Sequence, residues 1–397
     1  MLKTTSIPAI PRTVWLLGLV SLFMDLSSEL VHSLLPVFMV STLGVSVATV
    51  GLIEGVAEGA TLIAKVFSGA ISDHFRRRKT LILFGYAMAA LTKPLFPLAN
   101  SAEAVFIARF LDRIGKGIRG APRDALVADV APPAIRGACF GLRQSMDTVG
   151  AFLGPLLAIL MMSWFASDIR QVLWLAVVPA FITVLLILVG VEDPKGTCAR
   201  AGFRSPIRLG VLKQFSGDYW RVVAVGATFT LARFSEAFLV LRAQHVGFAI
   251  EWVPLVMIVM SLAYSVSAYP AGMLSDRVSR RYLLAAGMVL LTVADLILAW
   301  AGSPSIVLFG VALWGMHMGC TQGILAAMIA EATPAELKGT AFGLFNLASG
   351  LFMLLASVIA GGLWETYGPA STFSVGAAFS LSCLVMLISL APSRYET

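Results

Sequence analysis

The sequence predicts an all-α protein that crosses a membrane many times. Of its 397 residues, 58% are hydrophobic and only 13% are charged, and the mean hydropathy is +0.87. An ordinary soluble domain carries about 25% charged residues. Stretches of about 20 apolar residues, the length that crosses a bilayer as a helix, recur along the whole chain. The hydrophobic core is therefore expected to be shared with lipid.

Twelve such stretches divide into two sets of six. The first set covers residues 13–41, 47–71, 79–99, 102–128, 137–161 and 169–191. The second covers residues 218–244, 252–275, 281–300, 304–331, 338–364 and 369–391. Residues 192–217 between them form a longer basic segment rich in Gly and Pro. We predict one six-helix bundle over 1–191, a cytoplasmic linker over 192–217 and a second bundle over 218–397.

The first stretch is expected to stay in the mature protein as a spanning helix. It is too long for the apolar part of a cleavable signal peptide, it carries Asp25 and Glu29, and it lacks a small-residue cleavage site.

Basic residues set the orientation in the membrane. Eighteen of the 29 Lys and Arg fall in loops on one side, two on the other and nine inside the spans. By the positive-inside rule the first side is cytoplasmic, and the even number of spans places both termini there. The net charge of +7 therefore reflects orientation in the membrane and does not indicate nucleic-acid binding. The basic loops also lack the aromatic side chains that stack on nucleic-acid bases. We expect a monomer in the inner (plasma) membrane, surrounded by lipid.

The sequence shows no motif of an enzyme, cofactor or metal site. It lacks a phosphate-binding loop, a nucleophile elbow and zinc-ligand spacing. The four cysteines, at 139, 198, 320 and 383, are scattered without paired spacing. With no nucleotide site, any transport would have to be driven by a gradient.

The two halves of the chain repeat each other at an offset of about 200 residues. The segment GAISDHFRRR at 69–78 recurs as GMLSDRVSRR at 272–281, and RGACFGL at 136–142 recurs as KGTAFGL at 338–344. Because each half holds an even number of spans, the repeats lie parallel and relate by an axis along the membrane normal. This is the arrangement of transporters built from two rocking bundles.

Three motifs resemble those of the major facilitator superfamily. Gly69, Asp73 and Arg77 resemble its loop 2–3 signature, with a weaker copy in loop 8–9. Arg113-x-x-Lys116-Gly117 is similar to its helix 4 motif, with Lys where Gln is usual. Gly150-x-x-x-Gly154-Pro155 resembles the helix 5 motif of its proton-driven antiporters, although Leu156-Leu157-Ala158 replaces further glycines. The likeness covers essentially the whole chain.

This resemblance implies alternating access, with a gate on the cytoplasmic side. In the superfamily the acid of the signature contacts a helix end across the bundles, and the base pairs with an acid below helix 4. Asp129 would be that acid in this chain. The residues assigned to the gate are Gly69, Asp73, Arg77, Arg123, Asp124, Asp129, Asp276 and Arg280. Gly150 and Gly154 are assigned to close helix packing, and Pro155 to a bend.

The fourth span carries the densest charge. Asp112, Lys116, Arg119 and Arg123 recur at helical spacing on one face, and Arg109 extends it. Since a charge in hydrocarbon costs at least about 2.5–3.5 kcal/mol, this face must meet protein partners or a water-filled cavity. It could be an ion-pair lattice between helices or an anion site, because arginine forks suit carboxylate and phosphate. We favour the anion site, with candidates Arg109, Arg113, Lys116, Arg119, Arg143, Arg233 and Gln322.

Two pairs of acids, four residues apart, point to proton exchange. They are Asp25 with Glu29, and Glu54 with Glu58. Neighbouring buried carboxylates disfavour each other's charge, so one can exchange protons near neutral pH. We rank Glu29 and Glu58 first, with His32 as a further carrier, whereas simple pairing of each acid to a base is the alternative. His317, on an otherwise apolar span, is expected to be a core histidine with satisfied hydrogen bonds.

Eight of the nine bases inside spans belong to the first half, so that half should form the polar wall of a cavity. We expect a secondary transporter of a small, polar, anionic solute, coupled to protons. Lipid or drug-like amphiphile translocation is an alternative that needs an apolar wall in the second half. A non-transporting receptor or scaffold with the same fold is another.

Overall fold

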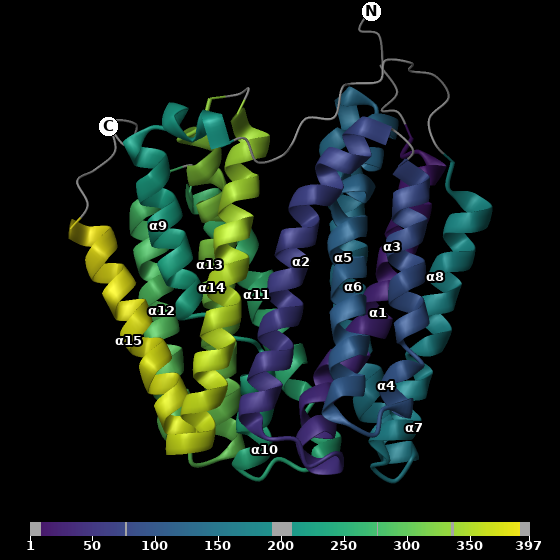
Figure 1. The fold of residues 1–397 in the computed structure, drawn as a ribbon, viewed down its shortest axis with the longest axis vertical. Coiled ribbons are helices and arrows are strands. Elements are labelled where there is room, and N and C mark those ends of the chain that lie inside the picture. Colours follow the sequence, from purple (N-terminus) through teal and green to yellow (C-terminus); the bar gives the residue numbers. More distant parts are fainter. Residues whose placement is uncertain (1–8, 76–77, 193–208, 276, 335–336, 390–397) are drawn as a thin grey trace, which may run out of the picture.

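The computed structural model describes residues 9–75, 78–192, 209–275, 277–334 and 337–389, and confirms the predicted all-α membrane fold. Its helices gather into two bundles that stand side by side (Figure 1). Among the described residues, ten helical stretches are long and apolar enough to cross a membrane. α5 and the pair α9–α10 lie at the positions of the other two predicted spans.

The first bundle begins with α1 (Arg12–Val37), which continues as a π-helical turn at Phe38–Thr42. The others are α2 (Val47–Phe75), α3 (Arg78–Thr92), α4 (Leu95–Leu98), α5 (Ala102–Val130), α6 (Arg136–Trp164), α7 (Ile169–Leu175) and α8 (Val177–Gly190). α4 is the short second part of the third predicted span. α7 is the short first part of the sixth. α1 packs against α6 and α8, while α5 lies between α2 and α3.

The second bundle follows a 3₁₀ turn at Leu209–Gln214. It holds α9 (Gly217–Leu231), α10 (Ala237–His245), α11 (Leu255–Ser275), α12 (Arg280–Trp300), α13 (Pro304–Glu331), α14 (Lys338–Tyr367) and α15 (Pro369–Ser389). α13 packs on α11 and α12, and α15 packs on α12, α14 and α9.

Two spans differ from the other ten. α5 carries too many charges to resemble an apolar span. The prediction of one continuous helix over 218–244 was wrong, because Ala232–Glu236 between α9 and α10 is not helical. Ser235 accounts for part of this break: its hydroxyl accepts a hydrogen bond from the Ala237 amide at 3.2 Å, which replaces a bond of a continuous helix. We call residues 232–236 the α9–α10 break.

The bundles touch most closely where α2 crosses α14. Glycines of α2 face the α14 backbone: a Cβ added to Gly51 would lie 2.4 Å from the Ser357 carbonyl oxygen, and one added to Gly55 would lie 2.9 Å from that of Leu354. Small residues allow this approach between membrane helices. α6 with α11, and α1 with α10, are further contacts between the bundles.

Polar contacts between the bundles lie toward one face of the molecule. α1 begins and α15 ends at the same face, while α4, α7 and α10 lie at the opposite face (Figure 1). Near that opposite face the bundles are joined by the hydrogen bonds Ser41–Gln244, Val47–Glu365 and Ser167–Glu251. We call it the closed face, and the other the terminal face.

At the terminal face, the ion pairs among the described residues stay within one bundle. Arg78 pairs with Asp129 in the first bundle at 2.9 Å, and Arg280 pairs with Glu331 in the second. Among the described residues, none of the hydrogen bonds between bundles lies here. The structure thus shows one state of a two-bundle molecule, closed at the end away from the described termini.

Candidate functional site

A cavity of about 500 Å³ lies between the two bundles. It reaches from the middle of the spans toward the terminal face. Its lining there includes residues from the half of each helix nearer that face: Lys65 of α2, Arg123 of α5 and Gln144 of α6. Its charged side chains are balanced in number. Six are bases, Lys65, Arg113, Lys116, Arg119, Arg123 and Arg233. Six are acids, Asp25, Glu29, Glu58, Asp124, Asp147 and Glu236.

The two walls of the cavity differ in chemistry. All of these charged residues except Arg233 and Glu236 come from the first bundle, as expected from the sequence. The second bundle contributes chiefly large apolar and aromatic side chains: Met257, Met260, Tyr264, Trp314, Met318 and Met353. A molecule in the cavity would meet charge on one side and a polarisable apolar surface on the other.

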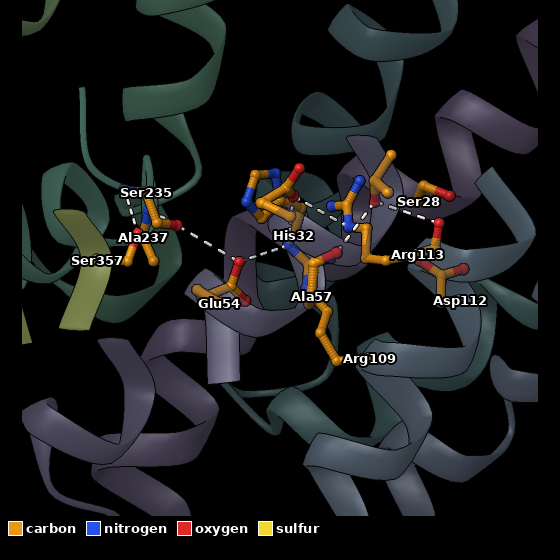
Figure 2. Close-up of polar contacts among 12 residues, drawn as sticks. Ser28, His32, Glu54, Ala57, Arg109, Asp112, Arg113, Ser235, Ala237 and Ser357 are labelled. Atoms are coloured by element: carbon orange, nitrogen blue, oxygen red, sulfur yellow. Dashed lines mark hydrogen bonds and ion pairs between the residues drawn. The ribbon is translucent and has the colours of Figure 1, made fainter. Parts of the chain in front are cut away.

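Part of the charged stripe on α5 is an ion-pair lattice within the first bundle. Asp112 accepts a hydrogen bond from Lys93 at 2.9 Å, and Lys93 also donates to Ser28 at 3.0 Å. All three side chains are buried. Lys93 stands at the turn between α3 and α4, so this contact ties α1, α3 and α5 together (Figure 2 shows Ser28 and Asp112).

The arginines one turn apart on α5 reach the acids of α2. Arg109 donates to Glu54 at 2.7 Å, and Arg113 pairs with Glu58 at 3.2 Å. Glu54 also accepts a weaker hydrogen bond, 3.4 Å long, from Ser235 in the α9–α10 break (Figure 2). Glu54 and Arg109 are almost completely buried and do not line the cavity. Arg109 is therefore paired with an acid outside the cavity lining, and its predicted contact with a ligand stays a prediction.

Nearer the terminal face, Arg123 and Asp124 belong to the cavity wall. Arg123 donates to Ser21 at 2.9 Å and pairs with Asp147 at 3.7 Å. Arg143 pairs with Asp124 at 3.6 Å and also bonds Asp147. Arg143 and Gln322, two of the predicted ligand contacts, lie outside the lining.

Four cavity-lining cations make no ion pair with the described residues. They are Lys65 on α2, Lys116 and Arg119 on α5, and Arg233 in the α9–α10 break. Lys65 was not among the predicted ligand contacts, although it continues the charged face of its helix.

Within the described chain, Arg119 and Arg233 contact no carboxylate, unlike the other arginines of the cavity. The Arg119 guanidinium stands over the Tyr86 ring, 4.7 Å from its centroid. Arg113 and Arg123, by contrast, each have a carboxylate in contact. Arg119, Arg233 and the two lysines are therefore the cavity cations that contact no carboxylate of the described residues.

The acids of the cavity also divide into paired and unpaired groups. Glu58 faces Arg113, and Glu29 contacts the His32 ring at 3.4 Å. The side chains of Asp25 and Glu236 make neither an ion pair nor a hydrogen bond with the described residues.

The remaining predicted residues have different surroundings. Gly150 and Gly154 on α6 lie against the α1 backbone, where added Cβ atoms would be 2.4 Å and 2.7 Å from carbonyl oxygens. Gly69 faces Ala121 of α5. The acid expected to pair with Arg77, Asp129, contacts Arg78. Arg77, Asp276 and the side chain of Asp73 lie outside the described residues.

Sequence reasoning missed the α9–α10 break. Its signal was present as four consecutive residues, Arg233 to Glu236, of which three are polar, in the centre of an otherwise apolar span. Interrupted helices in membrane proteins occur where backbone lines a cavity, and Arg233–Glu236 all line this one.

Two parallel bundles around a central polar cavity define a polytopic membrane transporter. The sequence profile of the Major Facilitator Superfamily matches residues 17–257 and 237–397, and the chain belongs to this superfamily. It is therefore a multi-pass membrane transporter and not an enzyme.

Known proteins agree with this assignment. An uncharacterized MFS-type transporter of Methanocaldococcus jannaschii is 30% identical over 95% of this chain and 94% of its own length. A probable 4-methylmuconolactone transporter of Cupriavidus pinatubonensis is 27% identical, covering 88% and 83%. The crystal structure of the nucleoside transporter NupG superposes with a TM-score of 0.77 at 13% identity, covering 95% and 98%, which shows a shared fold.

Proposed function

We propose that this protein is a secondary active transporter of an organic anion, coupled to protons. The observation that carries the proposal is the set of unpaired cations on the cavity: Lys65, Lys116 and Arg119 on one bundle, and Arg233 on the other. An anion held by both bundles would link ligand binding to their relative movement. Guanidinium forks and ammonium groups are suited to carboxylate or phosphate.

Proton coupling follows from the charge balance of the cavity. With six bases and six acids the cavity is formally neutral. Protonation of the unpaired Asp25 and Glu236 would leave an excess of two positive charges, which an anion compensates. Proton and anion therefore favour each other's binding, as in symport. This ranks Asp25 above Glu29 and Glu58, because those two acids already have basic partners.

Orientation and environment belong to the same proposal. The excess of bases in the loops at the terminal face supports cytoplasmic termini in the plasma membrane. The structure would then be the inward-facing state. The protein would act as a monomer.

The test is ligand binding to purified protein, read as a thermal shift. Benzoate, citrate and a hexose phosphate serve as probes, with choline and glucose as cationic and neutral controls. We expect stabilisation by anions alone. Lys116→Gln and Arg119→Gln should each weaken binding about tenfold or more, by analogy with the loss of a charged hydrogen bond. Lys116→Arg, and Arg221→Gln on the exposed end of α9, are the matched controls.

Wild-type affinity for anions in both glutamine variants would rule out the proposed anion site.

Proton coupling is tested in proteoliposomes. Asp25→Asn should abolish anion accumulation driven by a pH gradient but allow exchange of the same anion. Accumulation by Asp25→Asn at the wild-type level would exclude Asp25 as the coupling group.

Translocation of an anionic amphiphile is the second candidate, favoured by the four methionines of the second wall. A series of straight-chain carboxylates separates the two. Burying a methylene contributes about 0.8 kcal/mol, so each added carbon should tighten binding about fourfold if the chain lies on this wall. Affinity independent of chain length supports a small polar anion.

A further inference from the structure

Behind the apolar wall of the cavity, three polar side chains are buried without hydrogen-bond partners among the described residues. They are Asp295 on α12, and Trp314 and His317 on α13. Asp295 and His317 are 0% exposed, and Trp314 is 2% exposed. Neither oxygen of Asp295 and neither ring nitrogen of His317 has a hydrogen bond of normal geometry to the described residues, contrary to the expectation of a satisfied core histidine. The proposed transport mechanism uses none of them as a charge.

Trp314 connects this cluster to the cavity. Its indole lines the cavity, and its ring centroid is 4.7 Å from that of His317. The Asp295 carboxyl lies near the same indole, without a hydrogen bond of normal geometry to it. On the other side, a Cβ added to Gly376 of α15 would lie 2.7 Å from Asp295 Oδ2 and 2.9 Å from the ring of Phe234. Asp295 and Phe234 thus share the space that Gly376 leaves, and Phe234 belongs to the α9–α10 break.

Charged groups around Asp295 are few. α15, over its described residues, carries no acid or base, and α13 presents only His317 near this level. Arg233 lies close enough to His317 for their charges to interact, and Glu236 lies on the cavity, at the other end of the break. Asp295 makes no ion pair within the described chain. An ionised carboxylate here would be both desolvated and uncompensated, which is strongly unfavourable.

An apolar side chain would fill this site without leaving a polar group unbonded. Burying the carboxyl without a hydrogen bond therefore costs free energy in this conformation. A change in its surroundings during the transport cycle would account for its presence. The α9–α10 break is the element that can supply that change, because its residues do not belong to a helix and it contributes Phe234.

We propose that Asp295 is a proton-binding site of the second bundle, which holds its proton in the conformation seen here and exchanges it when Phe234 and Trp314 move and admit water from the cavity. The proposal rests on transport by alternating access but not on the anion site.

Infrared spectroscopy of the full-length protein tests it without any substrate. The carbonyl band of protonated carboxyl groups is recorded against pH for wild type and Asp295→Asn. A second pair of samples carries Ser41→Cys and Gln244→Cys, with the four native cysteines replaced by serine. A bifunctional thiol reagent then joins the bundles at the closed face, where these side chains meet.

We expect a protonated band at neutral pH that Asp295→Asn removes and that Asp218→Asn, an acid at the start of α9, leaves unchanged. This band should disappear at alkaline pH in the free protein and persist in the cross-linked protein. A spectrum unaffected by Asp295→Asn overturns the proposal, as does a band that responds equally to pH with and without the cross-link. If Asp295→Asn does not fold, Trp314→Phe replaces it, and an unshifted band then overturns the proposal.

Failure here and failure of the anion site can be told apart, since these spectra contain no anion. If the Asp295 proposal fails, the binding results for Lys116→Gln and Arg119→Gln are unaffected. If the anion site fails, the infrared result for Asp295→Asn is unaffected.

Discussion

The charges on α5 form a paired set and an unpaired set. Asp112, Arg109 and Arg113 contact opposite charges on α2 or at the α3–α4 turn, and their burial would be costly otherwise. Lys116 and Arg119 extend the same face but lack such partners among the described residues. The ion-pair hypothesis therefore fits Asp112, Arg109 and Arg113, and the proposed anion site is limited to Lys116 and Arg119 on this helix.

The pair of Glu54 and Arg109 gives a prediction about stability. Arg109→Gln leaves a carboxylate that is 0% exposed without its cation, and breaking such a buried pair costs about 3–5 kcal/mol. We expect a marked fall in unfolding temperature in detergent. Arg109→Lys should be intermediate, and the double variant Glu54→Gln/Arg109→Gln should recover most of the loss. A single variant as stable as wild type would show that Glu54 takes up a proton or another partner.

At this scale the sequence predicted which residues are charged in the membrane but not which charges pair. Lys93, Glu54 and Glu58 are distant in sequence from Asp112, Arg109 and Arg113, and helical spacing carries no information on neighbours from other helices. The unpaired state of Lys116 could only be seen once those neighbours were placed.

At the scale of elements, the contact of α2 with α14 holds the closed face together. It depends on glycine at positions where backbones meet, and α14 offers a matched pair of adjacent glycines. A Cβ on Gly361 would lie 2.9 Å from the Val47 carbonyl oxygen and 3.0 Å from Ala48 Cα, whereas one on Gly362 meets nothing within 4 Å.

We therefore predict that Gly361→Ala disfavours the state seen here and that Gly362→Ala does not. Overpacking against backbone costs about 1–3 kcal/mol, which is about a 5- to 150-fold change in the ratio of two states. Thiol cross-linking between Ser41→Cys and Gln244→Cys should slow in Gly361→Ala alone. Equal rates in the two glycine variants would mean that this contact yields without consequence.

Most elements could be predicted because apolar length determines a membrane helix. The α9–α10 break could not, since the span has the right length and its departure from helix depends on contacts elsewhere. The Ser235 amide donates to Ser357 of α14 at 3.1 Å and the Ser235 hydroxyl reaches Glu54 of α2. Neither partner is near it in sequence.

For the whole molecule, the internal repeat predicted two bundles, and the distribution of in-span bases predicted the polar wall. The conformation could not be predicted, because one sequence must encode both states of the cycle within a few kcal/mol. The boundaries of the two bundles at 191 and 218 also stay predictions, as residues 193–208 lie outside the described chain.

The state shown here has bundle contacts at the closed face, so the opposite state needs its own contacts at the terminal face. The signature of Gly69, Asp73 and Arg77 at the end of α2 is the predicted source of these contacts. If Asp73 supplies one charge-assisted contact there, Asp73→Asn should remove about 1–3 kcal/mol from the opposite state. The population would then shift toward the state seen here.

Cysteine labelling measures this shift from both ends. Cysteines at Arg136 and Lys338, where α6 and α14 begin at the terminal face, should react faster in Asp73→Asn. A cysteine at Gln171, on α7 near the closed face, should react more slowly. Asp218→Asn is the matched control: its carboxylate pairs with Arg221 on the same helix at 3.0 Å and should affect both states alike. Unchanged labelling at both ends in Asp73→Asn, with transport retained, would limit the signature to setting membrane orientation, because a gate residue must stabilise one state more than the other.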